Sequence, residues 1–188
     1  KYLSSTWKRN CEEERLLGVS LTGIMDSSLT NGSVVGLEVL SRVLQTGREI
    51  AVNTNREYAD KIGISQSASV TCVKPSGTVS QLVDASSGIH ARHNPYYIRT
   101  VRADRKDPLC KFMEDKGFPH EPCVMKPDHT MVFSFPIKSP DNALFRTDLS
   151  AIEQLDLWLV YQEHWCEHKP SVTITVKEHE WMDVGAWV

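Results

Sequence analysis

Residues 68–82 read ASVTCVKPSGTVSQL, and this stretch sets the architecture expected for the chain. Residues 68–73 are apolar, small or β-branched, a composition that predicts a strand. Pro75 and Gly77 then mark a turn, and apolar residues resume from Val79, so a helix is expected to begin there. A strand that leads through a tight turn into a helix is the building unit of α/β folds.

The same alternation of strands and helices is expected on both sides of this corner. The further strands are predicted at 18–24, 96–101, 131–137 and 172–176, the first of them being either a buried strand or a tight strand–helix junction. The further helices are predicted at 34–61, 107–116 and 150–168. This order predicts an α/β fold with largely parallel strands, in which ligands meet the loops at the carboxyl ends of the strands.

Composition limits the classes of function that the chain can have. An apolar share of 40% and a charged share of 24% in 188 residues are typical of one globular domain, here taken as 1–188. A net charge of −3 without a dense basic block argues against nucleic acid and membrane surfaces as partners. Five cysteines without a CxxC pair indicate reduced thiols, so a cytoplasmic protein is expected. Both ends of the sequence look internal to a longer chain.

The PSGT corner allows two interpretations. Gly77 lets the backbone approach a bulky anion, and Thr78 and Ser80 offer hydroxyls beside the free N–H groups at a helix start, so the corner can cradle a phosphate. Alternatively, Ser76 or Thr78 caps the helix, and the proline and glycine only shape the turn. The residues alone leave both interpretations open.

Three other groups of side chains are candidates for chemistry. In HWCEH, His164 and His168 stand four residues apart on an expected helix with Cys166 between them, a spacing that suits a metal. The alternative is that these histidines cap the end of the helix. His90 follows the corner and is a possible acid–base group, while Lys74 precedes it and is the cation most readily moved towards an anion.

Several blocks, in order along the chain, point to one family. They are EEERLLGVSLTGIMD, KPSGTVS, SGIHAR, PYYIRTVR and HWCEHKPSVTITVKEHEWMDVGAWV. Together they resemble the adenosylcobalamin-dependent, class II ribonucleotide reductases, most closely the monomeric ribonucleoside-triphosphate reductases. The resemblance implies part of a ten-stranded α/β barrel, from its second half. It also implies adenosylcobalamin as cofactor, a thioredoxin-like or dithiol reductant, and the remaining half of the barrel as a partner.

The resemblance further implies roles for individual residues. The family's loop for the phosphates of a ribonucleoside triphosphate matches Ser76, Gly77, Thr78, Val79 and Ser80, with Lys74 and His90 as further candidate contacts. The family's radical cysteine lies in an Asn-x-Cys-x-Glu pattern, which RNCEEE around Cys11 does not match. No catalytic residue is therefore expected in this segment, which should be inactive alone. A nucleotide-binding module without catalysis and a metal-binding domain are the alternatives.

Overall fold

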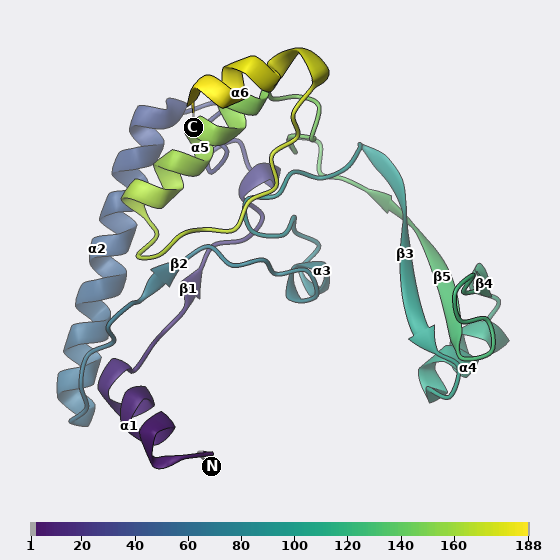
Figure 1. Ribbon diagram of the computed structural model, residues 1–188, viewed down its shortest axis with the longest axis horizontal. Helices are drawn as coiled ribbons and strands as arrows, with labels where there is room; N and C mark the ends of the chain where they lie inside the picture. Colours follow the sequence, from purple (N-terminus) through teal and green to yellow (C-terminus); the bar gives the residue numbers. More distant parts are fainter. Residues whose placement is uncertain (1–2, 188) are drawn as a thin grey trace. The chain divides into compact units, whose positions relative to one another are not determined.

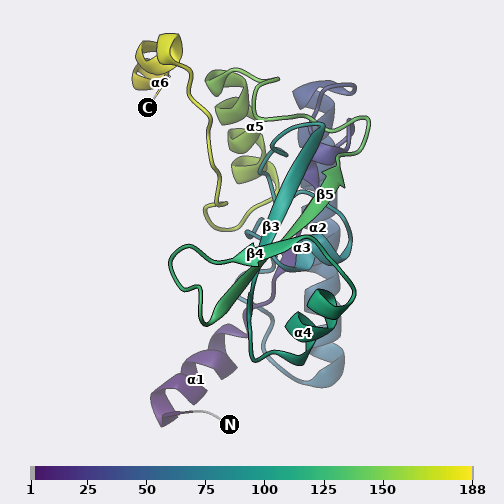
Figure 2. The ribbon, with the colours of Figure 1, turned by 90° about the vertical axis from the view of Figure 1, so that its right-hand side faces the viewer.

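The structure is a computed structural model that describes residues 3–187, shown in two views in Figures 1 and 2. The described residues form two compact units, one made of 3–92 together with 142–187 and the other of His93–Asp141. Among the described residues, every helix is too short or too polar to span a bilayer.

The first unit is built on a pair of parallel strands. β1 (Val19–Ser20) pairs with β2 (Thr71–Cys72), with Val19 opposite Thr71 and Ser20 opposite Cys72. Parallel strands need a long crossover connection, which here includes the 3-10 turn η1 (Ile24–Asp26) and the helix α2 (Gly36–Ile62). The strands predicted at 18–24 and 68–73 are thus present as two-residue strands, and the predicted order of strand, helix and strand holds for this part of the chain.

The helix α2 begins and ends close to the prediction, but its buried face differs. Gly63 caps its carboxyl end at φ 71°, a conformation that favours glycine. Leu40 and Leu44 are buried in the core, whereas Val43 and Ile50, which the 3.6-residue pattern placed on a buried stripe, are 48% and 62% exposed. The reason is that α5 packs on the Leu40 side of the helix and leaves the neighbouring apolar face without a cover in the described residues (Figure 1).

The helix α5 (Ala151–His164) supplies the other half of this core. Tyr161 is fully buried, and its hydroxyl donates to the carbonyl of Thr30 at 2.7 Å. The helix ends at His164, four residues before the predicted end, and Trp165 is its C-cap. The short elements α1 (Ser5–Glu14), η2 (Glu178–Glu180) and α6 (Trp181–Trp187) lie at the two ends of the described chain (Figure 1).

The strand predicted at 172–176 is not formed in the described structure. The backbone of Thr175 instead exchanges hydrogen bonds with the side chain of Gln154, which accepts from the N–H at 3.1 Å and donates to the carbonyl at 3.2 Å. A buried glutamine thus satisfies the backbone groups that a neighbouring strand would otherwise pair. The alternating apolar residues in this segment are only half-buried.

The second unit is an antiparallel sheet, contrary to the expectation of largely parallel strands. Its order is β3 (Tyr96–Asp104), β5 (Thr130–Lys138) and β4 (His120–Pro122). The helix α4 (Pro108–Asp115) is capped by Asp107, whose carboxylate accepts from the Leu109 N–H at 2.9 Å. Apolar residues at every second position, as at Met131, Phe133 and Phe135, are typical of antiparallel strands with one buried face, whereas the prediction of parallel strands came from the order of the elements.

The capping box at the start of α5 provides a test of local stability. Ser150 Oγ accepts from the Glu153 N–H at 3.2 Å, and Glu153 Oε2 accepts from the Ser150 N–H at 2.7 Å. Replacing Ser150 with alanine should lower the free energy of unfolding by about 1 kcal/mol, because one N–H of the first turn loses its acceptor. Urea unfolding measures this loss. Ser171→Ala, at an exposed loop serine, is the matched control, and equal effects of both substitutions would contradict the assignment.

Candidate functional site

The PSGT corner lies where both parallel strands end. After β1 the chain passes through Thr22, and after β2 it enters the loop from Lys74 to Ser80. The two ends are joined by side chains, since Thr22 Oγ1 lies 2.6 Å from Ser76 Oγ and the Lys74 N–H donates to Ser20 Oγ at 3.0 Å. The loop therefore occupies the carboxyl edge of the strands, which is where α/β folds hold ligands.

The loop keeps three consecutive backbone donors free. Within residues 3–187, the N–H groups of Gly77, Thr78 and Val79 have no hydrogen-bond partner, and all three residues are exposed. The next N–H, that of Ser80, donates to the Ser76 carbonyl at 2.8 Å and closes the loop. Successive free N–H groups on an exposed loop are donors of the kind that bind phosphate and other anions.

The hydroxyls of the loop do not cap the helix that follows. Thr78 is the N-cap of α3 (Val79–Leu82) but makes no side-chain cap bond, and the Ser76 hydroxyl is engaged by Thr22. The hydroxyl of Ser80 is buried and donates to the Ser76 carbonyl, so it shapes the loop and does not face solvent. Since α3 has only four residues, the donors of the loop and not a long helix dipole are the basis for anion binding here.

Gly77 is not required by the fold of the chain itself. A Cβ atom added at Gly77 would meet no atom within 4 Å, and its φ lies outside the left-handed region. Gly88 behind the loop differs, because its φ is +53° and an added Cβ would lie 3.0 Å from the Lys74 carbonyl oxygen. The space around the position of a Cβ atom at Gly77 is thus open in the described structure.

A second segment, residues 85–88, supports the loop from behind. Ser87 Oγ accepts from the Ser76 N–H at 2.9 Å, and Thr22 Oγ1 accepts from the Gly88 N–H at 3.0 Å. The Thr22 hydroxyl donates to the Ser86 carbonyl at 2.9 Å, so its proton is used and the Ser76 hydroxyl donates to Thr22. These contacts were not predicted, although Thr22 lies within the predicted segment 18–24, two residues after β1 ends.

A buried ion pair fixes this supporting segment. Arg92, whose side chain is 5% exposed, holds Asp26 through two hydrogen bonds of 3.0 Å and donates to the Asp84 carbonyl at 2.6 Å. The carboxylate of Asp26 also accepts from the Ser86 N–H at 2.7 Å. Arg92 therefore ties η1 to the chain that leaves α3, and a bidentate arginine–carboxylate pair imposes a fixed geometry on both.

The two further candidate contacts lie on either side of the loop. Lys74 is exposed directly before it. His90 is half-buried, its N–H donates to the Ser87 carbonyl at 2.9 Å, and burial lowers the pKa of its imidazole. A neutral His90 at pH 7 can donate or accept one hydrogen bond but adds no positive charge.

The structure does not bring His164, Cys166 and His168 together as a metal site. The helix ends at His164, so the expected spacing of one helical turn is lost, and His168 lies exposed beyond it. The Cys166 thiol is buried, which raises its pKa to about 11. Among residues 3–187, no group of three or more His, Cys, Asp and Glu side chains could hold a metal ion.

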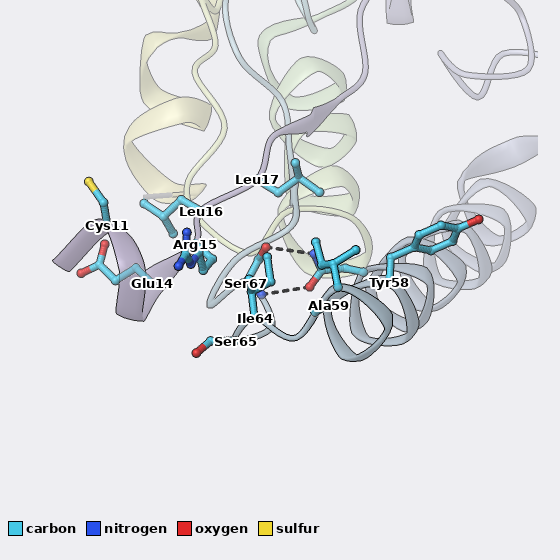
Figure 3. A pocket seen from close by; sticks show the side chains of 12 residues that line it. Cys11, Glu14, Arg15, Leu16, Leu17, Tyr58, Ala59, Ile64, Ser65 and Ser67 are labelled. Carbon is cyan, nitrogen blue, oxygen red and sulfur yellow. Dashed lines mark hydrogen bonds between the residues drawn. The ribbon is translucent and has the colours of Figure 1, made fainter. Parts of the chain in front are cut away.

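Cys11 lies in a different part of the first unit. It is half-buried on α1 and lines a groove of about 450 Å³ together with Arg15, Leu16 and Tyr58 (Figure 3). None of the residues from Lys74 to Ser80 lines this groove. Its lining is mostly apolar, and Cys11 is unpaired among the described cysteines.

Three known proteins are similar to this chain in sequence or in structure. The chain is 33% identical over 172 residues to an adenosylcobalamin-dependent ribonucleoside-triphosphate reductase of Euglena gracilis, covering 90% of this chain and 23% of that protein. The enzyme of the same name from Lactobacillus gasseri is 30% identical over 194 residues, covering 89% and 26%. A crystal structure of a B12-dependent (class II) ribonucleotide reductase superposes with a TM-score of 0.80 at 25% identity, covering 97% and 29%.

This chain is homologous to a segment of the class II ribonucleotide reductases. The resemblance stated from the sequence blocks is thereby confirmed, and the mixed α/β architecture agrees with that of the solved reductase. The chain spans about a quarter of the length of these reductases. No family model matches it.

Proposed function

We propose that the chain is part of an adenosylcobalamin-dependent ribonucleoside-triphosphate reductase, in which it supplies the loop that binds the substrate phosphates. The homology to reductases of that name supports the enzyme class. The observation that supports the role of this segment is the row of free N–H groups at Gly77, Thr78 and Val79, at the carboxyl ends of the parallel strands. Because the net charge of the chain is −3, the chain as a whole does not attract an anion, and a local set of donors has to bind it.

The loop is suited to a triphosphate in its chemistry. Each phosphate oxygen can accept from a backbone N–H, and hydrogen bonds to a charged acceptor are about twice as strong as neutral ones. The Thr78 hydroxyl adds a donor at the same face, and the Lys74 ammonium adds a positive charge nearby. The buried Ser80 hydroxyl and the Thr22–Ser76 contact keep the donors in place before the anion arrives, which reduces the entropy cost of binding.

The radical chemistry belongs to other parts of the longer protein. Adenosylcobalamin supplies the radical when it is bound, and we assign none of the residues described here to it. The sequence contains no Asn-x-Cys-x-Glu pattern, so the radical cysteine is placed outside these residues, as is the site of the external dithiol reductant. In this proposal the two parallel strands join the remaining strands of a ten-stranded barrel.

The activity is tested with the complete reading frame. The purified protein should convert ribonucleoside triphosphates to deoxyribonucleotides with adenosylcobalamin and a dithiol, and the 188-residue segment alone should form none. Substituting Cys11 with serine in the complete protein should leave turnover largely intact, because this thiol lies on α1, away from the loop. Turnover without the cofactor, or product formation by the segment alone, would contradict the proposal.

A further inference from the structure

The strand that leads into the loop has two edges, and only one of them is paired with another strand. β1 lies along one edge of β2, where the Val19 N–H donates to the Val70 carbonyl at 2.8 Å and the Leu21 N–H donates to the Cys72 carbonyl at 3.4 Å. The other edge carries backbone groups that also need partners, because an unpaired buried N–H or carbonyl is costly. Thr71 is fully buried, so water does not serve this edge.

The residues after α5 close this second edge. Glu167 Oε2 accepts from the N–H groups of Val70 and Thr71, the second at 2.8 Å, and the Glu167 N–H donates to the Thr71 carbonyl at 3.1 Å. The Trp165 indole donates at 2.8 Å to the Cys72 carbonyl, which also accepts from Leu21 on the first edge, so Trp165 holds the end of β2 while Glu167 closes the second edge. This part of the HWCEH motif therefore takes the place of a third strand beside β2 (Figure 1).

The closing segment is itself held rigidly. Trp165 is 6% exposed and lies against α2, where a Cβ atom added at Gly47 would come within 3.2 Å of the ring. The Thr71 hydroxyl donates to the Trp165 carbonyl at 2.6 Å, which ties the strand to the segment a second time. Burial raises the pKa of Glu167, but the N–H groups of Thr71 and Val70 outweigh it, so the pKa lies below the ordinary value and the carboxylate stays ionised at neutral pH.

These contacts lie immediately before the loop. Val70 and Thr71, held by Glu167, are followed by Cys72, held by Trp165, and Lys74 is the first residue of the loop. Thr71 lies three residues before Lys74, and an extended backbone rises about 3.3 Å per residue, so little chain separates the held residues from the start of the loop. A shift of Thr71 would therefore move the free N–H groups away from the positions that a phosphate requires.

We propose that Glu167 is a positioning residue for the phosphate loop, acting through β2 and without touching the substrate. This inference rests on the function proposed above for Gly77 to Val79. It gives the HWCEH motif a role other than metal binding, since its glutamate and tryptophan hold β2, the strand that leads into the loop.

The test is equilibrium binding to the complete protein without cobalamin, with inorganic tripolyphosphate as the probe and thermal unfolding measured in parallel. Glu167→Ala should raise the Kd for tripolyphosphate by roughly fivefold to tenfold, since two backbone donors of β2 lose their acceptor. Glu167→Gln should restore most of the affinity, because its amide oxygen can accept from the same N–H groups. Glu163→Ala, at an exposed glutamate on α5, is the matched control and should bind like the unsubstituted protein.

Gly77→Val in the same assay separates this inference from the proposed function. If Gly77→Val weakens binding but Glu167→Ala leaves the Kd unchanged and lowers only the unfolding temperature, the inference is overturned and the phosphate loop stands. If Gly77→Val has no effect, the phosphate loop itself is refuted, and the inference with it. Failure of Glu167→Gln to restore the affinity for tripolyphosphate would also overturn the inference about Glu167. Should Glu167→Ala not fold, Trp165→Phe removes the indole donor to Cys72 together with part of a buried ring, and an unchanged Kd in that folded variant overturns the inference.

Discussion

Replacing Gly77 with valine in the complete enzyme is expected to raise the KM for ribonucleoside triphosphates on the order of 100-fold. A valine side chain would fill the open space above the loop, where an added Cβ meets no atom of the chain within 4 Å. It would thereby keep the anion from at least two of the three free N–H groups. Hydrogen bonds to a charged acceptor contribute about 1.5–3 kcal/mol each, and each 1.4 kcal/mol is a factor of ten.

The matched variant is Thr78→Ala, which removes one hydroxyl and keeps every backbone donor. It should raise KM by about tenfold, well below the effect of Gly77→Val, since it removes one hydrogen bond to a charged acceptor, taken at the low end of about 1.5–3 kcal/mol. Steady-state kinetics with parallel thermal unfolding checks both variants. Because nothing in the fold requires glycine at position 77, the unfolding temperature of Gly77→Val should change little. An unaltered KM in that folded variant would show that the loop does not touch the substrate.

Substituting Arg92 with alanine is expected to lower the free energy of unfolding of the first unit by about 3–5 kcal/mol. Breaking a buried ion pair leaves the partner charge buried without compensation, which costs far more than the pair itself contributes. Here the partner is Asp26, which also receives the Ser86 N–H behind the loop. Denaturant unfolding followed by circular dichroism measures the loss, which should greatly exceed that of any surface arginine.

Arg56→Ala provides the comparison, because Arg56 is exposed on α2 and donates only to Asn53, at 3.3 Å. A surface substitution of this kind usually changes stability by less than about 0.5 kcal/mol. Replacing Arg92 and Asp26 together, by methionine and leucine, should recover much of the stability lost in Arg92→Ala, since no buried charge remains. Equal effects of Arg92→Ala and Arg56→Ala would show that the buried pair has no structural role.

The parts of the fold that were predicted correctly are those with local signals. The starts of α4 and α5 follow from Asp107 and Ser150, whose side chains cap helices within a few residues of themselves. The end of α5 and the missing strand at 172–176 depend on distant partners. Gln154, which takes the place of a strand partner for Thr175, is 21 residues away, and no sequence pattern around it indicates this contact.

The same distinction applies to the site. The turn residues of the loop are neighbours in the sequence, so the sequence alone predicted either a helix cap or an anion site there. Weighing these two interpretations required the positions of the Ser76 and Thr78 side chains. Thr22 and Ser87 were missed because each contacts the loop across the fold. The Arg92–Asp26 pair joins residues 66 apart, and neither residue stands in a pattern that would reveal the other.

The long-range contacts around the loop bear on how the protein folds during synthesis. The Thr22–Ser76 bond spans 54 residues and the Glu167–Val70 bond spans 97, so each requires the closure of a long loop of chain. The helix α2 can form transiently on a submicrosecond to microsecond scale, but its packing partner α5 is synthesised only later. At translation rates of about 5–20 residues per second, several seconds pass between the emergence of β2 and that of Glu167. A nascent chain should therefore leave one edge of β2 open to pairing with other chains for several seconds.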